Sequence, residues 1–425
     1  MAEPERLGAV DYLWLLIVLA LAAGARAWYV GIVADNGTSA GPLAVQRVTD
    51  GAGDPQPAPD REIAAGTGGL YPWLLARLND ACGDPAVARQ ATRWIQCALG
   101  ALTAVLYSLF ALRGFRSRLV GVLAGLLCAG YPFWVVNTTE LSDGVLASFL
   151  LATGLFLGAR GSRSGGALTS WFYGLALAGL AVVRVALLPF ALVAELWFLW
   201  RCRTLPRGWL YAVLAFLGCA TGLSPWVWQN FQDLRASSPV VDAAYLHLWI
   251  GNNPGTSNGP AVRAAAEKAP PTNRERARAV WHEVMDNPAG TIQRRLWAGL
   301  DFFFGEEWFQ HGRLWRPVPA SAGGSEPPGW FDQSHAAILS GALLAMFVLG
   351  IFGWRWSYGW REALPAALAV ALLPLPYLLS HAAALHGPRL PLDGVFLCYA
   401  AFALACLISP AGKIAVDGEN RSAVV

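Results

Sequence analysis

Charged side chains are scarce in this chain, and their scarcity argues against a soluble protein. Only 14% of the 425 residues are Asp, Glu, Lys or Arg, while 55% are apolar and the mean hydropathy is +0.42. A typical soluble domain carries about 25% charged residues. The composition therefore predicts a polytopic membrane protein rather than a soluble core with one anchor.

Lysine is nearly absent, since Lys268 and Lys413 are the only two. A phosphate-binding site in this chain would therefore be built from arginine, whose planar guanidinium can bind phosphate in bidentate fashion. The excess of arginine over lysine favours a bacterial origin through genome composition. The net charge of +3 gives no indication of a nucleic-acid partner.

Patterns typical of metal sites and disulfide frameworks are also missing. The seven cysteines are scattered without a CxxC pair, and no two histidines have the i, i+4 spacing with a neighbouring Glu that zinc enzymes use. We therefore expect no disulfide framework, no metal site and no cofactor.

Long apolar runs dominate what is present. A bilayer span needs about 20 apolar residues in a helix. The sequence contains ten apolar runs that approach or reach this length. Arg184 and Pro189 interrupt residues 171–200, which we interpret as two spans rather than one. The ten runs lie near 12–33, 91–112, 119–136, 145–159, 171–183, 186–200, 209–229, 336–354, 363–380 and 391–408.

The distribution of charge supports ten spans with both termini in the cytoplasm. Arginine clusters occur in every second short loop, as the positive-inside rule requires. Acidic residues instead fill the first loop, on the opposite side. One helix over 171–200 would place Arg355 and Arg361 outside. The predicted inner residues are Arg113, Arg116, Arg118, Arg160, Arg163, Arg201, Arg203, Arg207, Arg355, Arg361 and Lys413, and the outer acids are Asp35, Asp50, Asp54, Asp60 and Glu62.

The expected fold is thus an all-α polytopic membrane protein with two larger extracytoplasmic loops. We divide it into an N-terminal transmembrane module with the first loop (1–229), a large extracytoplasmic loop (230–335) and C-terminal transmembrane helices with a short tail (336–425). Each loop is expected to carry interfacial helical pieces, near 69–78 and 274–297.

Ionisable residues next to or within apolar runs are the first functional candidates. Arg184 lies inside an apolar stretch, where charge is costly and commonly faces a cavity or a partner. It could bind a ligand or form a structural salt bridge. Asp35 follows the first run and could be a general base, or a turn residue of Asp35-Asn36-Gly37. Arg26 could snorkel to the surface.

Glu140 and Asp143 occupy the second predicted outer turn, beside the first loop. They could bind an acceptor or orient a catalytic group. For Asp143 we favour capping of the following helix, because Asp is a preferred N-cap residue.

Several segments, in their order along the chain, resemble the GT-C superfamily of membrane glycosyltransferases. The resemblance is greatest to the branch of bacterial protein O-mannosyltransferases and lipid A aminoarabinose transferases. The matching elements are Arg26 with Asp35, Tyr71-Pro72 before an apolar helix, Gly179-Leu180-Ala181 followed by Arg184, the loop containing Gly251-Asn252-Asn253-Pro254, and Arg389-Leu390-Pro391.

This resemblance implies transfer of a hexosyl or pentosyl group from a polyprenyl-phosphate donor to an extracytoplasmic acceptor, with inversion. It implies that Asp35 is the catalytic base and that Arg184, Arg389 and Arg26 bind the donor phosphate. The implied acceptor-binding or orienting residues are Glu140, Asp143, Tyr71, Asn252 and Asn253. The implied location is the bacterial cytoplasmic membrane, with membrane lipids and other membrane proteins as further partners.

Two other classes of function remain open. Members of the family usually have a second acidic residue or a Tyr shortly after the first Asp, whereas Asn36-Gly37-Thr38 follow Asp35 here. That difference favours a catalytically inactive GT-C-like scaffold subunit of a larger membrane complex. A transporter or flippase is the third class, for which repeats or several charges within spans would be expected.

The absence of metal-ligand spacing generates a test. We expect sugar transfer by the protein in membranes to survive incubation with EDTA, because no convincing set of metal ligands is present in the sequence. Loss of transfer with EDTA and its recovery on adding a divalent cation would contradict this expectation.

Overall fold

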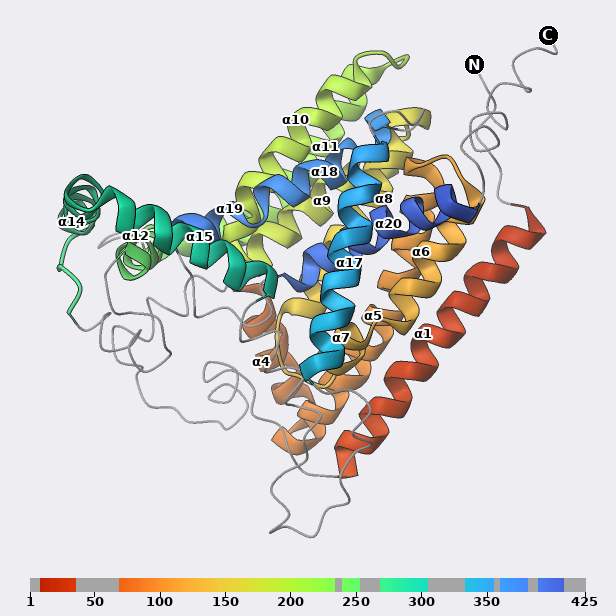
Figure 1. Ribbon diagram of the computed structural model, residues 1–425, viewed down its shortest axis with the longest axis horizontal. Helices are drawn as coiled ribbons and strands as arrows, with labels where there is room; N and C mark the ends of the chain where they lie inside the picture. Colours follow the sequence, from red (N-terminus) through yellow and green to blue (C-terminus); the bar gives the residue numbers. More distant parts are fainter. Residues whose placement is uncertain are drawn as a thin grey trace.

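The computed structural model is built from helices packed into a bundle, with a smaller helical group at one side (Figure 1). It describes residues 8–35, 69–233, 239–252, 268–304, 333–354, 360–380 and 389–408. Within these ranges the secondary structure is entirely helical. Seven helices are long and apolar enough to cross a membrane, and three shorter apolar helices accompany them. The expectation of an all-α polytopic membrane protein is confirmed.

All ten predicted apolar runs coincide with helices, although two of them are broken by proline. The run at 119–136 forms α6 (Arg118–Gly130) and α7 (Pro132–Asn137), and the run at 363–380 forms α18 (Trp360–Leu372) and α19 (Leu375–Ser380). Proline fits the first turn of a helix because its missing N–H needs no partner there. The other eight runs correspond to α1 (Ala9–Asp35), α5 (Pro85–Gly114), α8 (Gly144–Ser164), α9 (Ala167–Val183), α10 (Leu188–Cys202), α11 (Gly208–Asp233), α17 (Gln333–Trp354) and α20 (Leu390–Ile408).

The predicted interruption at 171–200 is confirmed. Helix α9 ends at Val183, Arg184 is extended at φ −138° and ψ 108°, and a 3-10 turn at Val185–Leu187 leads into α10. Pro189 lies in the first turn of α10, where it starts the new helix. The extended backbone at Arg184 turns its long side chain away from the helix axis.

Helices outside the bundle correspond to the predicted outer segments. The expected piece at 69–78 is α4 (Leu70–Cys82), which buries Tyr71 and Leu75 one turn apart. The expected piece at 274–297 is two helices, α14 (Asn273–Asp286) and α15 (Pro288–Phe304), because Pro288 starts a new helix. With α12 (Pro239–Asn252), these two helices form the group at the side of the bundle (Figure 1).

Packing places α5 and α20 at the centre of the bundle. Helix α5 contacts α1, α6 and α8, and α20 contacts α17, α6 and α8. The opposite extreme is α11, which packs mainly on α9, with a smaller contact to α10, while most of its surface faces outward. Central helices position the site described below, and peripheral ones provide the surface that lipid would cover.

Small residues allow the close approach of α9 and α11. A Cβ atom added to Gly174 would overlap the backbone carbonyl oxygen of Ala215, and one added to Gly218 would overlap that of Trp171. Gly218 and Gly222 have the GxxxG spacing that lets membrane helices pack backbone to backbone. The contact is therefore steric and has little room for adjustment.

We expect Gly174→Ala to lower the free energy of unfolding by about 1 to 3 kcal/mol, the usual cost of overpacking a tight contact. The matched control is Gly24→Ala, because no atom lies within 4 Å of a Cβ at that position. Thermal unfolding of the purified protein in detergent would measure both. Equal melting temperatures for the two variants would contradict the steric account.

Candidate functional site

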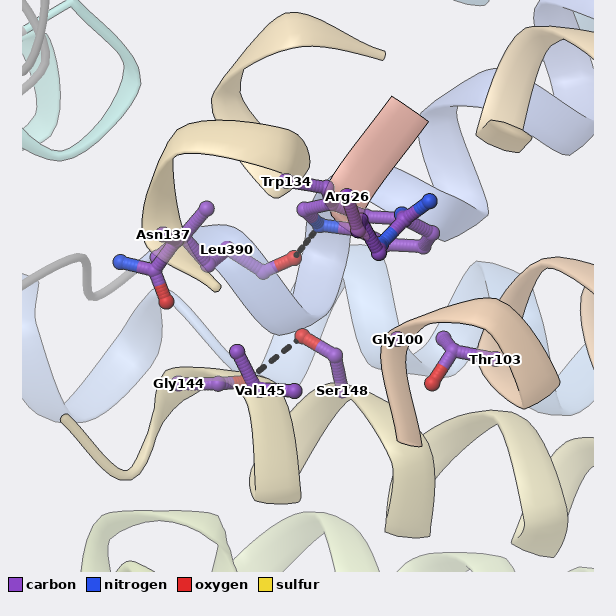
Figure 2. A pocket seen from close by; sticks show the side chains of 9 residues that line it. All are labelled: Arg26, Gly100, Thr103, Trp134, Asn137, Gly144, Val145, Ser148 and Leu390. Carbon is purple, nitrogen blue, oxygen red and sulfur yellow. Dashed lines mark hydrogen bonds between the residues drawn. The ribbon is translucent and has the colours of Figure 1, made fainter. Parts of the chain in front are cut away.

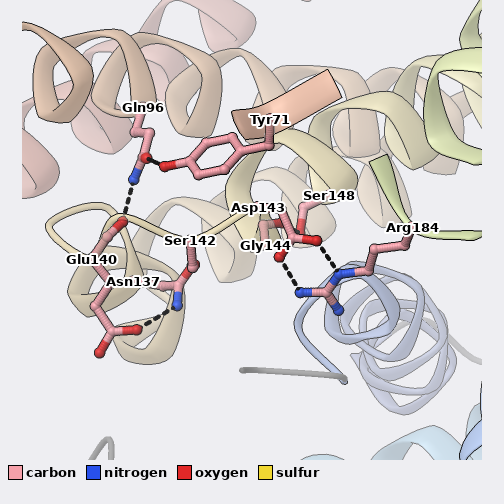
Figure 3. Close-up of polar contacts among 9 residues, drawn as sticks. All are labelled: Tyr71, Gln96, Asn137, Glu140, Ser142, Asp143, Gly144, Ser148 and Arg184. Atoms are coloured by element: carbon pink, nitrogen blue, oxygen red, sulfur yellow. Dashed lines mark hydrogen bonds and ion pairs between the residues drawn. The ribbon is translucent and has the colours of Figure 1, made fainter. Parts of the chain in front are cut away.

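The clearest polar contact between distant parts of the chain joins Arg184 to Asp143. Arg184 Nε lies 2.7 Å from Asp143 Oδ2, and Arg184 Nη2 lies 2.7 Å from Oδ1. The Arg184 side chain is fully buried, whereas the Asp143 side chain is 12% exposed. Figure 3 shows the two parallel contacts. The carboxylate is thus the member of the pair that an incoming molecule could reach.

This pairing corrects the role that the sequence indicated for Asp143. The residue does occupy the N-cap position of α8, as predicted, but its side chain makes no capping hydrogen bond. Its oxygens bind Arg184 instead. A buried guanidinium without a counter-charge costs far more than an uncapped helix N–H group, so the ion pair takes precedence. The prediction that Arg184 binds a phosphate stays a prediction.

The turn before α8 is held by a chain of side-chain hydrogen bonds. Gln96 of α5 donates through Nε2 to the carbonyl oxygens of Thr138 at 3.0 Å and Glu140 at 2.7 Å. The Tyr71 hydroxyl of α4 donates to Gln96 Oε1 at 2.6 Å. Asn137 Nδ2 donates to the Glu140 carboxylate at 3.1 Å (Figure 3). Tyr71, Glu140 and Asp143, all predicted site residues, therefore belong to one region.

The Tyr71 phenol is buried and lies close enough to Asp143 to feel the charge of its carboxylate. Burial, and after it the charge of Asp143, raises the pKa of the Tyr71 phenol well above its usual range. The hydroxyl therefore remains protonated and keeps donating to Gln96. Gln96 was not among the sequence candidates, because a glutamine in an apolar helix carries no signal until its partners are known.

Arg389, the third predicted site arginine, lies in a second buried ion pair. Its Nε is 2.6 Å from Asp393 Oδ1, and its Nη1 donates to the carbonyl of Phe303 at the end of α15. The Tyr131 hydroxyl donates to Asp393 Oδ2 at 3.1 Å. Arg389 and Asp393 are 1% and 0% exposed. The pair orients Arg389, and the hydrogen bond from Arg389 to Phe303 then links the start of α20 to α15.

Arg26 is fully buried within the bundle, so the alternative that its head snorkels to the surface is not what the structure shows. Its guanidinium donates to the carbonyl oxygens of Ala22, Ala129 and Cys128, while Nε has no partner among the described residues. It lines a cavity of about 10 Å³ together with Gly100, Asn137 and Ser148 (Figure 2). That volume suits about one water molecule and is too small for a sugar ring.

The remaining predicted residues fall near or beyond the described ranges. Asp35 is the last residue of α1, and its side chain lies outside the described residues, as does Asn253. Asn252 is described and ends α12. Its Oδ1 accepts a hydrogen bond of 2.9 Å from Arg295, which also donates to the carbonyl oxygens of Leu378 and Leu379.

Metal ligation receives no support from the described residues, among which no group of three His, Cys, Asp or Glu could hold an ion. The described part of the region in Figure 3 offers two carboxylates, Glu140 and Asp143, with arginine and amide partners. Such a set can orient a hydroxyl or amine through hydrogen bonds and accept its proton.

No protein-family model and no curated protein sequence matches this chain. A solved structure does: the archaeal oligosaccharyltransferase AglB from Archaeoglobus fulgidus, in complex with an inhibitory peptide and a dolichol-phosphate. The likeness has a TM-score of 0.50 at 15% sequence identity and covers 98% of this chain. The fold is GT-C-like.

The GT-C-like fold agrees with the fold that the sequence resemblance implied, while the superfamily and its bacterial branch stay predictions. At this identity the likeness concerns the fold alone. This chain spans about half of the oligosaccharyltransferase, 52% of its length. The multi-pass membrane character expected from the sequence agrees with both the apolar helices and this neighbour.

We expect Asp143→Ala to destabilise the protein by about 3 to 5 kcal/mol, because it removes the carboxylate that neutralises a fully buried arginine. The double variant Asp143→Leu with Arg184→Met should recover most of that loss. Unfolding by heat in detergent provides the measurement, with Asp84→Ala as a control that removes only an exposed helix cap, worth about 1 kcal/mol. Additive losses in the double variant would show that the pair is not coupled.

Proposed function

We propose that the protein transfers a sugar from a polyprenyl-phosphate donor to an acceptor on the extracytoplasmic side of the membrane. The observation that carries this proposal is Asp143, a partly exposed carboxylate oriented by the fully buried Arg184. Asp143 belongs to a GT-C-like fold, and the solved neighbour with this fold is in complex with an inhibitory peptide and a dolichol-phosphate. A lipid-linked donor and a separate acceptor are the matching substrate classes.

Finer assignments follow the sequence resemblance. We place the protein in the bacterial branch that contains protein O-mannosyltransferases and aminoarabinose transferases, in the cytoplasmic membrane with both termini inside. The arginine-rich inner loops support this orientation.

The proposed reaction is a single inverting displacement. A hydroxyl oxygen of the acceptor attacks the anomeric carbon of the donor, the bond from that carbon to the phosphate oxygen breaks, and the lipid phosphate leaves with the bonding electrons. A base takes the hydroxyl proton. We assign this role to Asp35. Support comes from the end of α1 at this residue, which the predicted topology puts on the outer side of the membrane.

Asp143 and Glu140 are proposed to orient the acceptor. Both carboxylates belong to the turn that Gln96 holds in place, so their positions are fixed before a substrate arrives. Preorganised polar groups of this kind lower the cost of ordering a substrate. Tyr71 supports the turn through Gln96, and Asn252 and Asn253 are proposed to contact a sugar.

Arg184, Arg389 and Arg26 remain proposed contacts of the donor phosphate, with a condition that the structure supplies. Arg184 and Arg389 bind carboxylates, and Arg26 binds carbonyl oxygens. A phosphate that takes the place of the carboxylate on Arg184 or Arg389 requires release of Asp143 or Asp393. Without that exchange, Arg184 acts by holding Asp143 in its orientation.

The neutralised arginines also favour the alternative, an inactive scaffold subunit. A site in which Arg184 and Arg389 are neutralised by internal carboxylates has less positive charge to offer a phosphate. The enzyme proposal predicts sugar transfer that depends on an acidic side chain, whereas the scaffold proposal predicts no sugar transfer.

We expect Asp35→Asn to reduce transfer of labelled sugar by at least about a hundredfold, the usual contribution of a general base. The assay uses membranes supplied with a panel of polyprenyl-phosphate sugars. Asp50→Asn, in the same acidic loop, is the matched control and should retain activity. Wild-type transfer by Asp35→Asn would remove Asp35 from the mechanism. No transfer by the folded wild type from any donor would favour the scaffold.

A further inference from the structure

Arg93 differs from Arg184 and Arg389 because it has no carboxylate partner among the described residues. It lies in the third turn of α5 and is 8% exposed. Its Nε donates to the carbonyl oxygen of Thr139 at 3.4 Å, and its Nη1 donates to Gln90 Oε1 at 3.4 Å. Both bonds are long for this kind of contact and involve neutral acceptors.

The Arg93 guanidinium therefore has N–H groups left that can donate hydrogen bonds to a ligand. A guanidinium has five N–H groups, and only two of those of Arg93 have an acceptor among the described residues. None of its nitrogens is enclosed without a partner. The free N–H groups accordingly reach the surface of the described protein.

The position of Arg93 along α5 corresponds to the level of lipid phosphates. Arg93 and Arg113, near the other end of α5, are 20 residues apart. At 1.5 Å per residue, that separation is about 30 Å, the thickness of a hydrocarbon core. If Arg113 lies at one boundary of the core, Arg93 lies at the other, which the charge pattern of the loops assigns to the outside.

Arg93 also contacts the candidate site directly. It bonds to Thr139, while Gln96, one turn along the same face of α5, bonds to Thr138 and Glu140. The unpaired cation therefore lies beside the turn that carries the Glu140 and Asp143 carboxylates. An anion placed on Arg93 would have its remaining atoms within reach of that turn.

From this geometry we infer that Arg93 binds the phosphate of an isoprenoid phosphate at the outer membrane boundary. The inference deepens the proposed function, on which it rests for the lipid part of the ligand. A phosphate fits because its oxygens can accept several N–H bonds from one guanidinium. Arg89, one turn earlier on α5 and partly exposed, adds positive charge nearby.

Binding of farnesyl phosphate to the full-length protein in phosphatidylcholine nanodiscs tests the inference. Farnesol, which lacks the phosphate, and inorganic phosphate, which lacks the lipid, are measured in parallel. We expect Arg93→Gln to weaken farnesyl phosphate binding by about tenfold or more, the contribution of one charge-assisted hydrogen bond. Farnesol binding should be unchanged.

Two further variants keep the test independent of folding. Gln90→Glu retains Arg93 but gives it an internal carboxylate in place of the amide, so it should also weaken farnesyl phosphate binding. Arg113→Gln removes a charge from the opposite end of α5 and should have no effect. Unchanged farnesyl phosphate affinity in both Arg93→Gln and Gln90→Glu would overturn the inference.

The parallel ligands and a transfer assay separate the remaining outcomes. Arg93-dependent binding that inorganic phosphate matches in affinity would support a phosphate site filled from solution, and tighter farnesyl phosphate binding would support the lipid. Arg93-dependent binding without any sugar transfer would leave the inference standing while the proposed function fails. Transfer by Arg93→Gln with an unchanged KM for the donor would refute the inference while the function stands.

Discussion

The ion pair between Arg184 and Asp143 is the constraint from which the outer end of the bundle follows. A guanidinium enclosed among apolar helices has to meet an opposite charge or lose several kcal/mol of stability. Arg184 meets it by leaving helical geometry, so that α9 ends and α10 begins on either side of it. Asp143 in turn gives up its capping role, and the turn before α8 is fixed in the orientation that exposes its carboxylate.

The same rule applies at the predicted inner end, where carboxylates tie helices together. Glu362 of α18 accepts hydrogen bonds from Arg116 at 3.0 Å and from Arg201 at 3.2 Å. Asp11 of α1 binds Arg118 at 3.2 Å. Most of these contacts link residues more than 100 positions apart, so each one fixes the relative placement of two helices. Acidic residues in this chain are few, and the described ones within the bundle commonly have arginine partners.

Arg93 stands out by comparison with these ion-paired arginines. In a bundle where Arg184 and Arg389 are neutralised by Asp143 and Asp393, an arginine held only by a carbonyl and an amide oxygen has spare positive charge. On the predicted topology it lies at the outer membrane boundary, beside the turn that carries the candidate acceptor-binding carboxylates. The proposed division of labour is therefore a phosphate on α5 and an acceptor at the start of α8, on a GT-C-like scaffold half the length of its solved neighbour.

The sequence by itself determined the helices and their approximate ends. Apolar runs must be helical in a bilayer because backbone groups have no other partners there, and Pro189 indicated the break beside Arg184. The tertiary structure decided what each polar residue does. Asp143 looked like a helix cap because its local sequence allows one, yet its partner lies 41 positions away. Gln96 and Arg93 gave no signal, since whether a polar group is satisfied depends on neighbours that only folding brings within hydrogen-bonding distance.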